Sequence, residues 1–447
     1  MCRDTMSDTD SPGIEHENFT KWAVAHGIKI KGVAPARFPG RRLGMIATRH
    51  IKENEIMLSI PVKLMLTIDS IPREFVSQFP EGASIHGILA AFLTHGDPKL
   101  LSELDTWRSV WPDWEEFESS MPIFWPKHLR VSSSTFEIPS EEDQHQSVSE
   151  GAPVLLPPSI SGRWNSLPSI SQSAPKPYET RYQNLLAQQE KRLKSAWDSV
   201  VSVFPETEWK TFAYNWSIIN SRSFYYISPG KDEPEDWNDA IGMVPYADYF
   251  NHVDDAACEV KFDGWKYTFK ATRRYVRGEE VYMSYGSHTN DFLLVEYGFC
   301  PDDNPSDSVY LDDLIIPDLS AEQKEALDAH DCLGNYEVLS SGLDERLVAV
   351  ANIKYMSLKD WRGLTNGKDG LERASDAKRV REIHRGWLER YLEEGTLAVR
   401  ATKDLLKTAA DESTRAKLDL ILSRWKQIMQ LCESAFESTS PYNKGHI

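Results

Sequence analysis

Hydrophobic and polar residues alternate differently in successive regions of the chain, and each pattern predicts a type of structure. Residues 1–18 are polar and predict a flexible tail. The segment FTKWAVAHGI, which starts at Phe19, predicts a short helix. Two β-branched runs, at 43–51 and 55–61, are separated by the charged turn KEN and predict a pair of strands. The N-terminal part of the chain is therefore expected to be rich in β structure.

The middle and C-terminal parts show loop and helix patterns. A Ser- and Pro-rich segment at about 132–180 predicts a long surface loop, and the apolar spacing that follows, up to Phe204, predicts an amphipathic helix. Asp263-Gly264 lies between two strand-like runs, which indicates a hairpin. After about residue 313 the pattern predicts a helical bundle, whose clearest apolar face consists of Leu418, Ile421, Leu422, Trp425, Met429, Cys432 and Phe436.

The composition limits the partners that we expect. The chain has 447 residues, with 50 Lys and Arg against 68 Asp and Glu, so its formal charge is −18. Nucleic acids and anionic membranes bind basic surfaces, so we expect neither as a partner, whereas a basic protein substrate fits the charge. The five cysteines include no CxxC pair, which favours a reducing compartment over a disulfide framework or a zinc site. Because no long apolar run is present, we expect neither a signal peptide nor a membrane span.

Few segments carry residues typical of a catalytic site. The sequence contains no P-loop, HExxH or GxSxG motif and no EF-hand loop, and its twelve histidines form no evident metal cluster. Three segments combine apolar runs with polar residues, and they contain Arg222, Asn251-His252 and Tyr285. Each of these residues alone is more often structural than functional. Their order along the chain favours one shared functional site.

These segments resemble the SET-domain protein methyltransferases, in particular the subgroup of Rubisco large-subunit lysine methyltransferase, fungal ribosomal-protein lysine methyltransferases and actin-histidine methyltransferase. The resemblance covers almost the whole chain from Phe19 and includes the motifs LGMIATRHI, WSIINSRSF, ADYFNH, GEEVYMSYG and NDFLLVEYGF. It implies an α+β fold with a β-rich, pseudoknotted SET domain at 19–312, a helical and loop-rich insert at about 86–215, and an all-α C-terminal domain at 313–447 that binds the substrate.

The resemblance implies S-adenosylmethionine as the cofactor and S-adenosylhomocysteine as its product. We expect Arg222 to bind the cofactor's carboxylate, and Asn251 with the His252 backbone to bind its ammonium group and adenine edge. The turn at Gly44 lets the main chain approach the cofactor, and Arg42 in place of a usual glycine is expected to lower affinity without abolishing binding. The implied cofactor-binding residues are Arg41, Arg42, Leu43, Gly44, Ser221, Arg222, Asp248, Asn251, His252, Tyr285 and Phe299.

Methyl transfer to lysine requires an uncharged amine that is aligned with the methyl donor. A free lysine amine has a pKa of about 10.4, and an apolar channel beside a positively charged sulfonium lowers it. The resemblance implies that Tyr285 is the catalytic residue, which positions the methyl group and the sulfonium, and that Tyr297 orients the amine. Phe224 and Cys258 are the other candidates for substrate binding, and Cys258 occupies a position where plant relatives often have tyrosine. No metal ligand is implied.

The favoured function is S-adenosylmethionine-dependent methylation of a lysine in a non-histone protein, with a ribosomal protein as the favoured substrate. The chain lacks the cysteine cluster that follows the motif GEEVYMSYG in many histone-directed relatives, which supports a non-histone substrate. The alternatives are histidine methylation and an inactive SET-fold scaffold that binds a protein. The presence of Arg222, Asn251, His252 and Tyr285 disfavours the scaffold. We expect the protein in the cytoplasm, with the nucleus as a second location.

Overall fold

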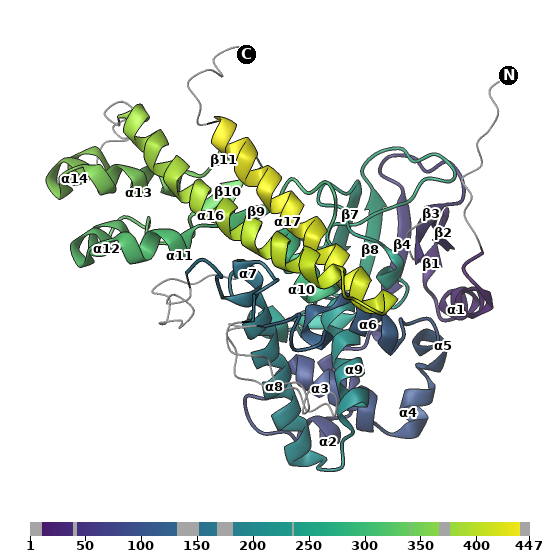
Figure 1. The fold of residues 1–447 in the computed structure, drawn as a ribbon. Coiled ribbons are helices and arrows are strands. Elements are labelled where there is room, and N and C mark those ends of the chain that lie inside the picture. The colour runs from purple at the N-terminus through teal and green to yellow at the C-terminus, as the bar shows by residue number, and fades with distance from the viewer. Residues whose placement is uncertain are drawn as a thin grey trace. The chain divides into compact units, whose positions relative to one another are not determined.

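The chain forms two compact units (Figure 1). The first consists of Met1–Phe117 and Lys191–Ser287, and the second of Glu118–Glu190 and His288–Ile447. The chain therefore passes between the units after residues 117, 190 and 287. The computed structural model describes residues 11–38, 43–131, 152–167, 182–234, 237–340, 342–365 and 376–438.

Antiparallel sheets form the β part of the first unit. The largest has the strand order β1-β4-β8-β7, which joins Lys29–Ile30, Ile56–Pro61, Lys266–Ala271 and Cys258–Phe262 (Figure 1). Two smaller sheets pair β2 with β3 and β5 with β6, which are Val33–Arg37, Leu43–Ala47, Ser223–Tyr225 and Ile241–Met243. Asp263-Gly264 closes the β7–β8 hairpin, and Gly264 has a φ of +87°, which glycine adopts without strain. The predicted hairpin is confirmed.

The two strands predicted at 43–51 and 55–61 both form, but the prediction that they pair with each other is wrong. β3 pairs with β2, while β4 is hydrogen-bonded along its two edges to β1 and β8. Both edges of β4 are therefore occupied. The alternation of side chains identifies a strand, but it does not identify the strand's partner, because the partner is set by packing between distant segments.

The predicted insert at about 86–215 is helical in most of its described residues. Helix α3 packs on α9, where the rings of His86 and Trp216 stack with centroids 4.6 Å apart. Helices α6 and α8 each cross a boundary between the units. The helices up to residue 222 that lie wholly or partly in the first unit are α1 Ile14–Ala25, α2 Arg73–Val76, α3 Ile85–His95, α4 Pro98–Ser102, α5 Asp105–Arg108, α6 Trp114–Ser120, α8 Leu185–Val203 and α9 Trp209–Arg222.

Helix α1 begins at Ile14, within the segment 1–18 for which the polar pattern predicted a flexible tail. The cause is His16, which is only 3% exposed and whose Nδ1 lies 2.8 Å from the hydroxyl of Tyr249. One buried polar contact therefore anchors a turn of helix that contains few apolar residues. The first ten residues of the predicted tail lie outside the described residues.

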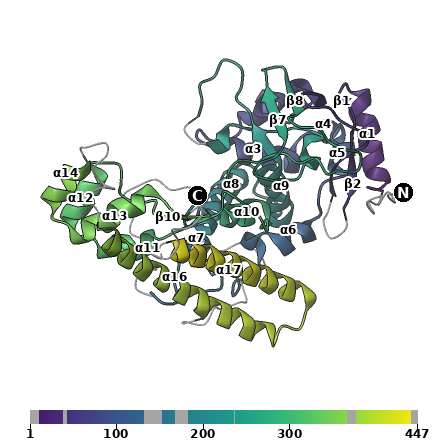
Figure 2. The same cartoon turned by 90° about the horizontal axis from the view of Figure 1, so that it is seen from above.

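The second unit is mostly helical. Helices α16 and α17 lie side by side along most of their length (Figures 1 and 2). Gly395 on α16 allows this approach, because a Cβ atom there would lie 3.2 Å from Met429 and 3.3 Å from Trp425 on α17. The helices are α7 Pro158–Ser161, α10 Asn290–Tyr297, α11 Asp312–Ile315, α12 Ala321–Asp328, α13 Glu345–Tyr355, α14 Leu358–Thr365, α16 Ala377–Leu406 and α17 Glu412–Ser438.

The α+β fold with a helical C-terminal region is confirmed, with one difference. The region predicted as all-α also contributes two strands to a small sheet with the order β11-β10-β9, which joins Gly342–Leu343, Glu337–Leu339 and Ser308–Tyr310. Strands of two or three residues are too short to show a two-residue period in the sequence.

Single-turn 3₁₀ helices occur in both units. Among the described residues they are Val62–Leu64, Ile68–Ser70, Pro122–Phe124, Trp237–Asp239, Ala247–Tyr249 and Ile316–Asp318.

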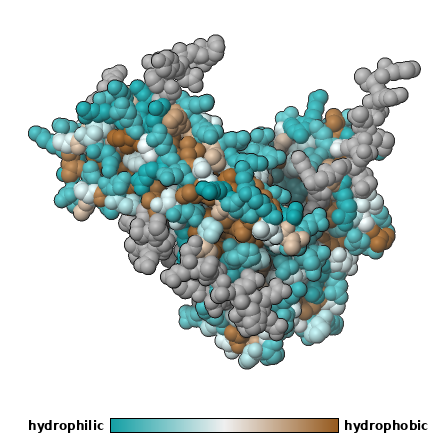
Figure 3. Space-filling model, in the orientation of Figure 1, coloured by the Kyte–Doolittle hydropathy of each residue, from teal (hydrophilic) through white to brown (hydrophobic). Residues whose placement is uncertain are grey.

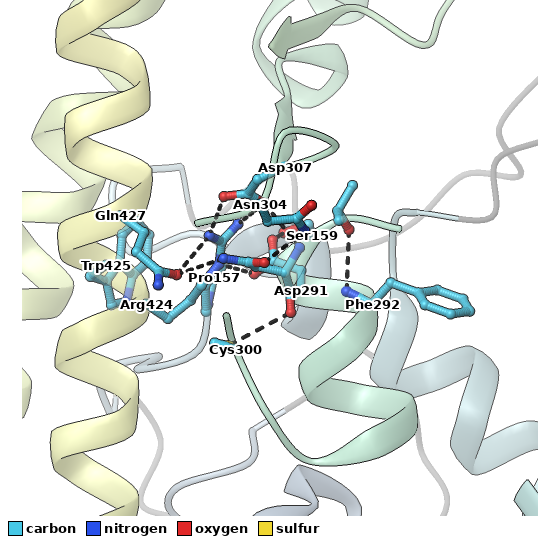
Figure 4. Close-up of polar contacts among 12 residues, drawn as sticks. Pro157, Ser159, Asp291, Phe292, Cys300, Asn304, Asp307, Arg424, Trp425 and Gln427 are labelled. Atoms are coloured by element: carbon cyan, nitrogen blue, oxygen red, sulfur yellow. Dashed lines mark hydrogen bonds and ion pairs between the residues drawn. The ribbon is translucent and has the colours of Figure 1, made fainter. Parts of the chain in front are cut away.

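A buried ionic cluster connects α10 to α17 in the second unit (Figure 4). Arg424 is fully buried within the predicted apolar face of α17, and its Nε donates to Asp291 on α10 over 2.6 Å. Its Nη1 and Nη2 donate to the two carboxylate oxygens of Asp307 over 2.7 and 3.0 Å. Ser159 also donates to Asp291. These bonds connect Asp291 and Asp307 to α17 within the second unit, and the predicted boundary at 313 stays a prediction.

Hydrophilic residues cover most of the face drawn in Figure 3, and the hydrophobic residues on it form small groups. Within the described part of the chain, no helix is both long enough and apolar enough to cross a membrane. The large side chains of the core, such as Trp216 and Trp425, are fully buried.

Candidate functional site

Residues 278–285 form the centre of the site in the first unit, because they pair with two earlier segments. The amide of Val281 donates to the carbonyl of Met45 on β3 over 2.7 Å. The amide of Met283 donates to the carbonyl of Asn251 over 2.9 Å, and the amide of Val253 donates back to Met283. The segment is thus hydrogen-bonded both to β3 and to the Asn-His motif.

Tyr285 is fixed by two hydrogen bonds to the Asn-His segment. Its hydroxyl donates to the carbonyl of Phe250 over 2.7 Å, and its amide donates to Nδ1 of His252 over 3.0 Å. Burial raises the pKa of the Tyr285 hydroxyl to about 12, so this group stays protonated at neutral pH. Tyr285 can therefore place an oxygen atom accurately, but it cannot serve as a base.

Gly44 lies in strand β3, where it pairs with Ala36, and not in the turn that the sequence predicted. The side chain of Asn251 contacts this strand. Nδ2 of Asn251 donates to the carbonyl of Leu43 over 3.0 Å and to the Glu280 carboxylate over 2.8 Å. A Cβ atom at position 44 would lie 2.7 Å from Nδ2 of Asn251 and 2.5 Å from Oε1 of Glu280. Position 44 is buried and has no room for a side chain unless Asn251 or Glu280 shifts. Arg41 and Arg42 lie outside the described residues.

This crowding predicts the cost of a single added methyl group. Gly44→Ala is expected to lower the free energy of unfolding by about 1–3 kcal/mol, because Asn251 or Glu280 must shift. Gly386→Ala on α16 is the matched control, since nothing lies within 4 Å of its new Cβ, and alanine should stabilise this helix by about 0.5–1 kcal/mol. Chemical denaturation measures both, and an unchanged stability of Gly44→Ala would refute the tight packing.

Arg222 brings a positive charge to the C-terminal end of α9. Its Nη1 donates to the hydroxyl of Ser221 over 2.7 Å, and its guanidinium lies over the ring of Phe117 at 5.9 Å from the centroid. Ser221 and Ser223 donate to carbonyls four residues earlier, which satisfies backbone groups where the helix ends and β5 begins. Arg222 is thus held at a junction between a helix and a strand.

Asp248 lies within electrostatic range of this arginine. Its carboxylate accepts a hydrogen bond from Nε1 of Trp107 over 3.0 Å. Burial raises the pKa of Asp248, and the positive charge of Arg222 opposes this rise. The same charge opposes the upward shift of the Tyr285 pKa, so Arg222 acts on both groups. Sequence reasoning missed Trp107 and Phe117, which come from a segment without a recognisable motif.

An aromatic cluster connects the substrate-binding candidate Phe224 to the site. The ring of Phe224 contacts the rings of Tyr267 and Phe269 on β8, with centroids 5.7 and 6.1 Å apart. Phe269 stacks on Phe250, whose carbonyl binds Tyr285. Sequence reasoning did not select Tyr267 and Phe269, although both fall on the buried side of the alternating strand β8.

Cys258 opens β7 opposite Ala271 on β8. Burial raises the pKa of its thiol to about 12, so the sulfur is uncharged at neutral pH. It lies two residues from Val260, which pairs with Phe269. Cys258 is therefore a small, neutral side chain in this sheet, and it lacks the hydroxyl group that a tyrosine would provide.

Tyr297 and Phe299 belong to the second unit. Tyr297 ends α10, Gly298 follows with a φ of +79°, and the rings of Tyr297 and Phe299 lie 6.3 Å apart. The predicted roles of these two residues beside Tyr285 stay predictions. Among the residues that the structure describes in the first unit, the predicted site residues that it brings together are Leu43, Gly44, Ser221, Arg222, Phe224, Asp248, Asn251, His252 and Tyr285.

Comparison with known proteins identifies the family. The family model described as "SET domain" matches residues 42–286, which is more than half of the chain. The chain belongs to the SET-domain family. This match includes Gly44, Arg222, the Asn-His segment and Tyr285, all of which lie in the first unit.

Several SET-domain relatives are named for methyl transfer to proteins. The chain is 29% identical over 222 residues to ribosomal lysine N-methyltransferase set11 of Schizosaccharomyces pombe, which covers 48% of this chain and 56% of the relative. It is 22% identical over 316 residues to SET domain-containing protein 4 of Homo sapiens, covering 68% and 63% of the two chains. The chain thus spans roughly three fifths of the length of these curated relatives.

Solved structures of a SET-domain methyltransferase share this fold. The SET domain of LSMT bound to lysine and AdoHcy aligns with a TM-score of 0.56 and 16% identity, covering 95% of this chain and 92% of that chain. Rubisco LSMT bound to AdoMet aligns with a TM-score of 0.55 and 16% identity, covering 96% and 93%. The likeness extends over both compact units, and at this identity it establishes the fold.

Proposed function

We propose that this SET-domain protein transfers a methyl group from S-adenosylmethionine to a lysine side chain of a non-histone protein. The observation that carries the proposal is that Gly44, Asn251 and Tyr285 meet around residues 278–285 in the first unit, and that the charge of Arg222 acts on Tyr285. The names of the fungal ribosomal lysine methyltransferases, and the AdoMet and AdoHcy in the related LSMT structures, support the choice of reaction and cofactor.

The residues fit the chemical groups of the cofactor. The guanidinium of Arg222 would bind a carboxylate by charge and paired hydrogen bonds. The amide of Asn251 offers an oxygen that would accept from an ammonium group, because its nitrogen already donates to Leu43 and Glu280. Gly44 would let Asn251 and Glu280 pack directly against β3, since a side chain there has no room.

The chain's own residues would then align and desolvate the reacting groups. When bound, S-adenosylmethionine supplies a methyl group on a positively charged sulfur. The Tyr285 hydroxyl donates a hydrogen bond to the carbonyl of Phe250, so its oxygen would interact with the reacting groups as an acceptor. Because burial raises its pKa to about 12, Tyr285 is protonated at neutral pH and would not accept the lysine proton. The rings around Phe224 would lower the pKa of an entering amine by desolvation.

Histidine methylation is the second candidate function. The chain is 43% identical over 51 residues to the actin-histidine N-methyltransferase of Drosophila melanogaster, although this covers only 11% of the chain. The actin-histidine N-methyltransferase of Gallus gallus matches over 302 residues at 22% identity. We favour lysine because the ribosomal lysine methyltransferases are more similar where they match, at 29% identity over 222 residues and 31% over 160 residues. We further propose a basic substrate, with a ribosomal protein favoured, since the chain carries a formal charge of −18. We also propose that the helical region 313–447 binds this substrate, in the cytoplasm or the nucleus.

One incubation separates an enzyme from an inactive scaffold. The chain is mixed with S-adenosylmethionine carrying a labelled methyl group and with a lysate of cells that lack this protein. The proposal predicts at least one labelled protein band that is absent when the chain is omitted. Binding of S-adenosylmethionine without any labelled band would favour the scaffold.

Removal of the Arg222 guanidinium should weaken cofactor binding. Arg222→Ala is expected to reduce the affinity for S-adenosylmethionine by about 1.5–3 kcal/mol, the typical range for a charge-assisted hydrogen bond. Titration calorimetry measures this loss. Arg273→Ala is the matched control, because Arg273 is half exposed and pairs with Glu279 in the same unit, and its loss should leave the affinity unchanged. An unchanged dissociation constant in Arg222→Ala would remove Arg222 from the carboxylate role.

A further inference from the structure

We propose that Glu280 is a positioning residue that orients the Asn251 amide, so that its oxygen and not its nitrogen faces the ammonium group of the cofactor. The inference rests on the proposed function, because it concerns the same cofactor site. Glu280 belongs to the motif GEEVYMSYG, but neither the sequence patterns nor the proposed mechanism gives it a role.

Glu280 is held on both of its carboxylate oxygens. Oε1 accepts from Nδ2 of Asn251 over 2.8 Å, and Oε2 accepts from the hydroxyl of Tyr282 over 2.5 Å. Ile46 on β3 forms a β-bridge with residue 280, which fixes its backbone. A Cβ atom at Gly44 would lie only 2.5 Å from Oε1, so the carboxylate lies directly against β3. The carboxylate is thus enclosed by β3, the Asn251 amide and the Tyr282 hydroxyl.

This enclosure determines which end of the Asn251 amide is available. Nδ2 carries two hydrogen atoms, and its two partners are the Glu280 carboxylate and the Leu43 carbonyl. Both partners only accept hydrogen bonds. A flipped amide would place Oδ1 against two acceptors and lose both bonds, so the observed orientation is strongly favoured. Oδ1 is therefore directed away from Glu280, where it can accept from a cation.

Replacement of Glu280 by glutamine weakens this constraint. The glutamine amide has nearly the same shape, but it can turn its NH₂ group toward Asn251 and donate to Oδ1 of the flipped amide, so the flipped orientation then loses only the bond to Leu43. The nitrogen of Asn251 would then face the cofactor's ammonium group, where two donors repel each other. The expected defect concerns only ligands that carry the ammonium group.

The test compares two ligands on the folded chain. S-adenosylhomocysteine carries the ammonium group, and its desamino analogue has hydrogen in that place. We expect the wild type to bind S-adenosylhomocysteine at least about tenfold more tightly, and Glu280→Gln to reduce this ratio to about threefold or less without weakening the analogue. Tyr282→Phe should lower the ratio less. Glu279→Gln is the matched control and should keep the full ratio, because Glu279 binds Arg273 and the Val276 amide.

A double-mutant cycle separates positioning from direct attraction by the charge of Glu280. In an Asn251→Ala background, positioning through Asn251 predicts that Glu280→Gln changes the ligand ratio no further, whereas direct attraction predicts the same loss as in the wild type. If Glu280→Gln does not fold, Tyr282→Phe is measured in the wild-type and the Asn251→Ala backgrounds. This substitution keeps the charge of Glu280, so it also distinguishes positioning from direct attraction. Equal weakening of both ligands by Glu280→Gln would also overturn the inference.

The remaining outcomes distinguish this inference from the proposed function. If the wild type binds both ligands equally well, the ammonium group is not recognised and the role of Glu280 is refuted, while the proposed function stands. If the wild type binds neither S-adenosylhomocysteine nor its analogue, the proposed function fails and the inference fails with it. Thermal melting of each variant confirms that the ligands are compared on folded protein.

Discussion

Replacement of Arg424 by methionine is expected to lower the free energy of unfolding by about 3–5 kcal/mol, one of the two largest effects that we predict. Methionine fills much of the same space, but it leaves the carboxylates of Asp291 and Asp307 buried without their cation. Removing one partner of a buried ionic cluster lowers the stability by more than the whole cluster adds to it, because the remaining charges stay desolvated. Chemical denaturation of the two proteins at neutral pH measures the difference.

Two control variants show whether this loss comes from the buried charges. Arg379→Met on α16 replaces an exposed arginine that pairs with Asp376, and we expect a change of less than about 0.5 kcal/mol. The triple variant with Arg424→Met, Asp291→Asn and Asp307→Asn removes all three charges and should regain part of the lost stability. If Arg424→Met is as stable as the wild type, the cluster does not hold α10 against α17.

Tyr285→Phe should reduce the rate of methyl transfer by about 10²–10³, equivalent to roughly 2.7–4 kcal/mol, with little change in cofactor affinity. The substitution keeps the ring and removes only the oxygen atom that Phe250 fixes by a 2.7 Å hydrogen bond. If this oxygen positions the methyl group and the amine, its loss raises the barrier to transfer while the fold remains. Single-turnover transfer at saturating S-adenosylmethionine gives this rate directly.

Tyr275→Phe provides a matched control for this experiment. The Tyr275 hydroxyl also donates to a backbone carbonyl, that of Ala257, over 2.9 Å, and its side chain is 2% exposed. Loss of the Tyr275 hydroxyl should lower the free energy of unfolding by about 1 kcal/mol and leave the rate of methyl transfer unchanged. If Tyr285→Phe transfers methyl groups as fast as the wild type, Tyr285 is a structural residue and its catalytic role must be abandoned.

The ordered motifs predicted a shared site, and the structure joins Gly44, Asn251 and Tyr285 through Glu280 and Phe250. The roles of these residues toward the cofactor and the substrate stay predictions. The fold class was predicted from the same motifs, and the segment 278–285 pairs with both β3 and the Asn-His segment.

Other features could not be predicted, because no local pattern carries them. Trp107 reaches Asp248 from a short helix about 140 residues earlier in the chain, and only tertiary packing brings the two together. An apolar helix face predicts no arginine, yet Arg424 lies within one because Asp291 and Asp307 compensate its charge. His16 likewise starts α1 early through a single contact with Tyr249.

The identity of the methylated amino acid tests the central claim most directly. The chain is incubated with methyl-labelled S-adenosylmethionine and a lysate of cells that lack this protein, and the labelled protein is hydrolysed completely to amino acids. We predict that the label co-elutes with a methylated lysine when wild-type chain is used, and that it falls to background with Tyr285→Phe in the same short incubation. Label in methylhistidine, or no enzyme-dependent label at all, would contradict the assignment of a protein-lysine methyltransferase.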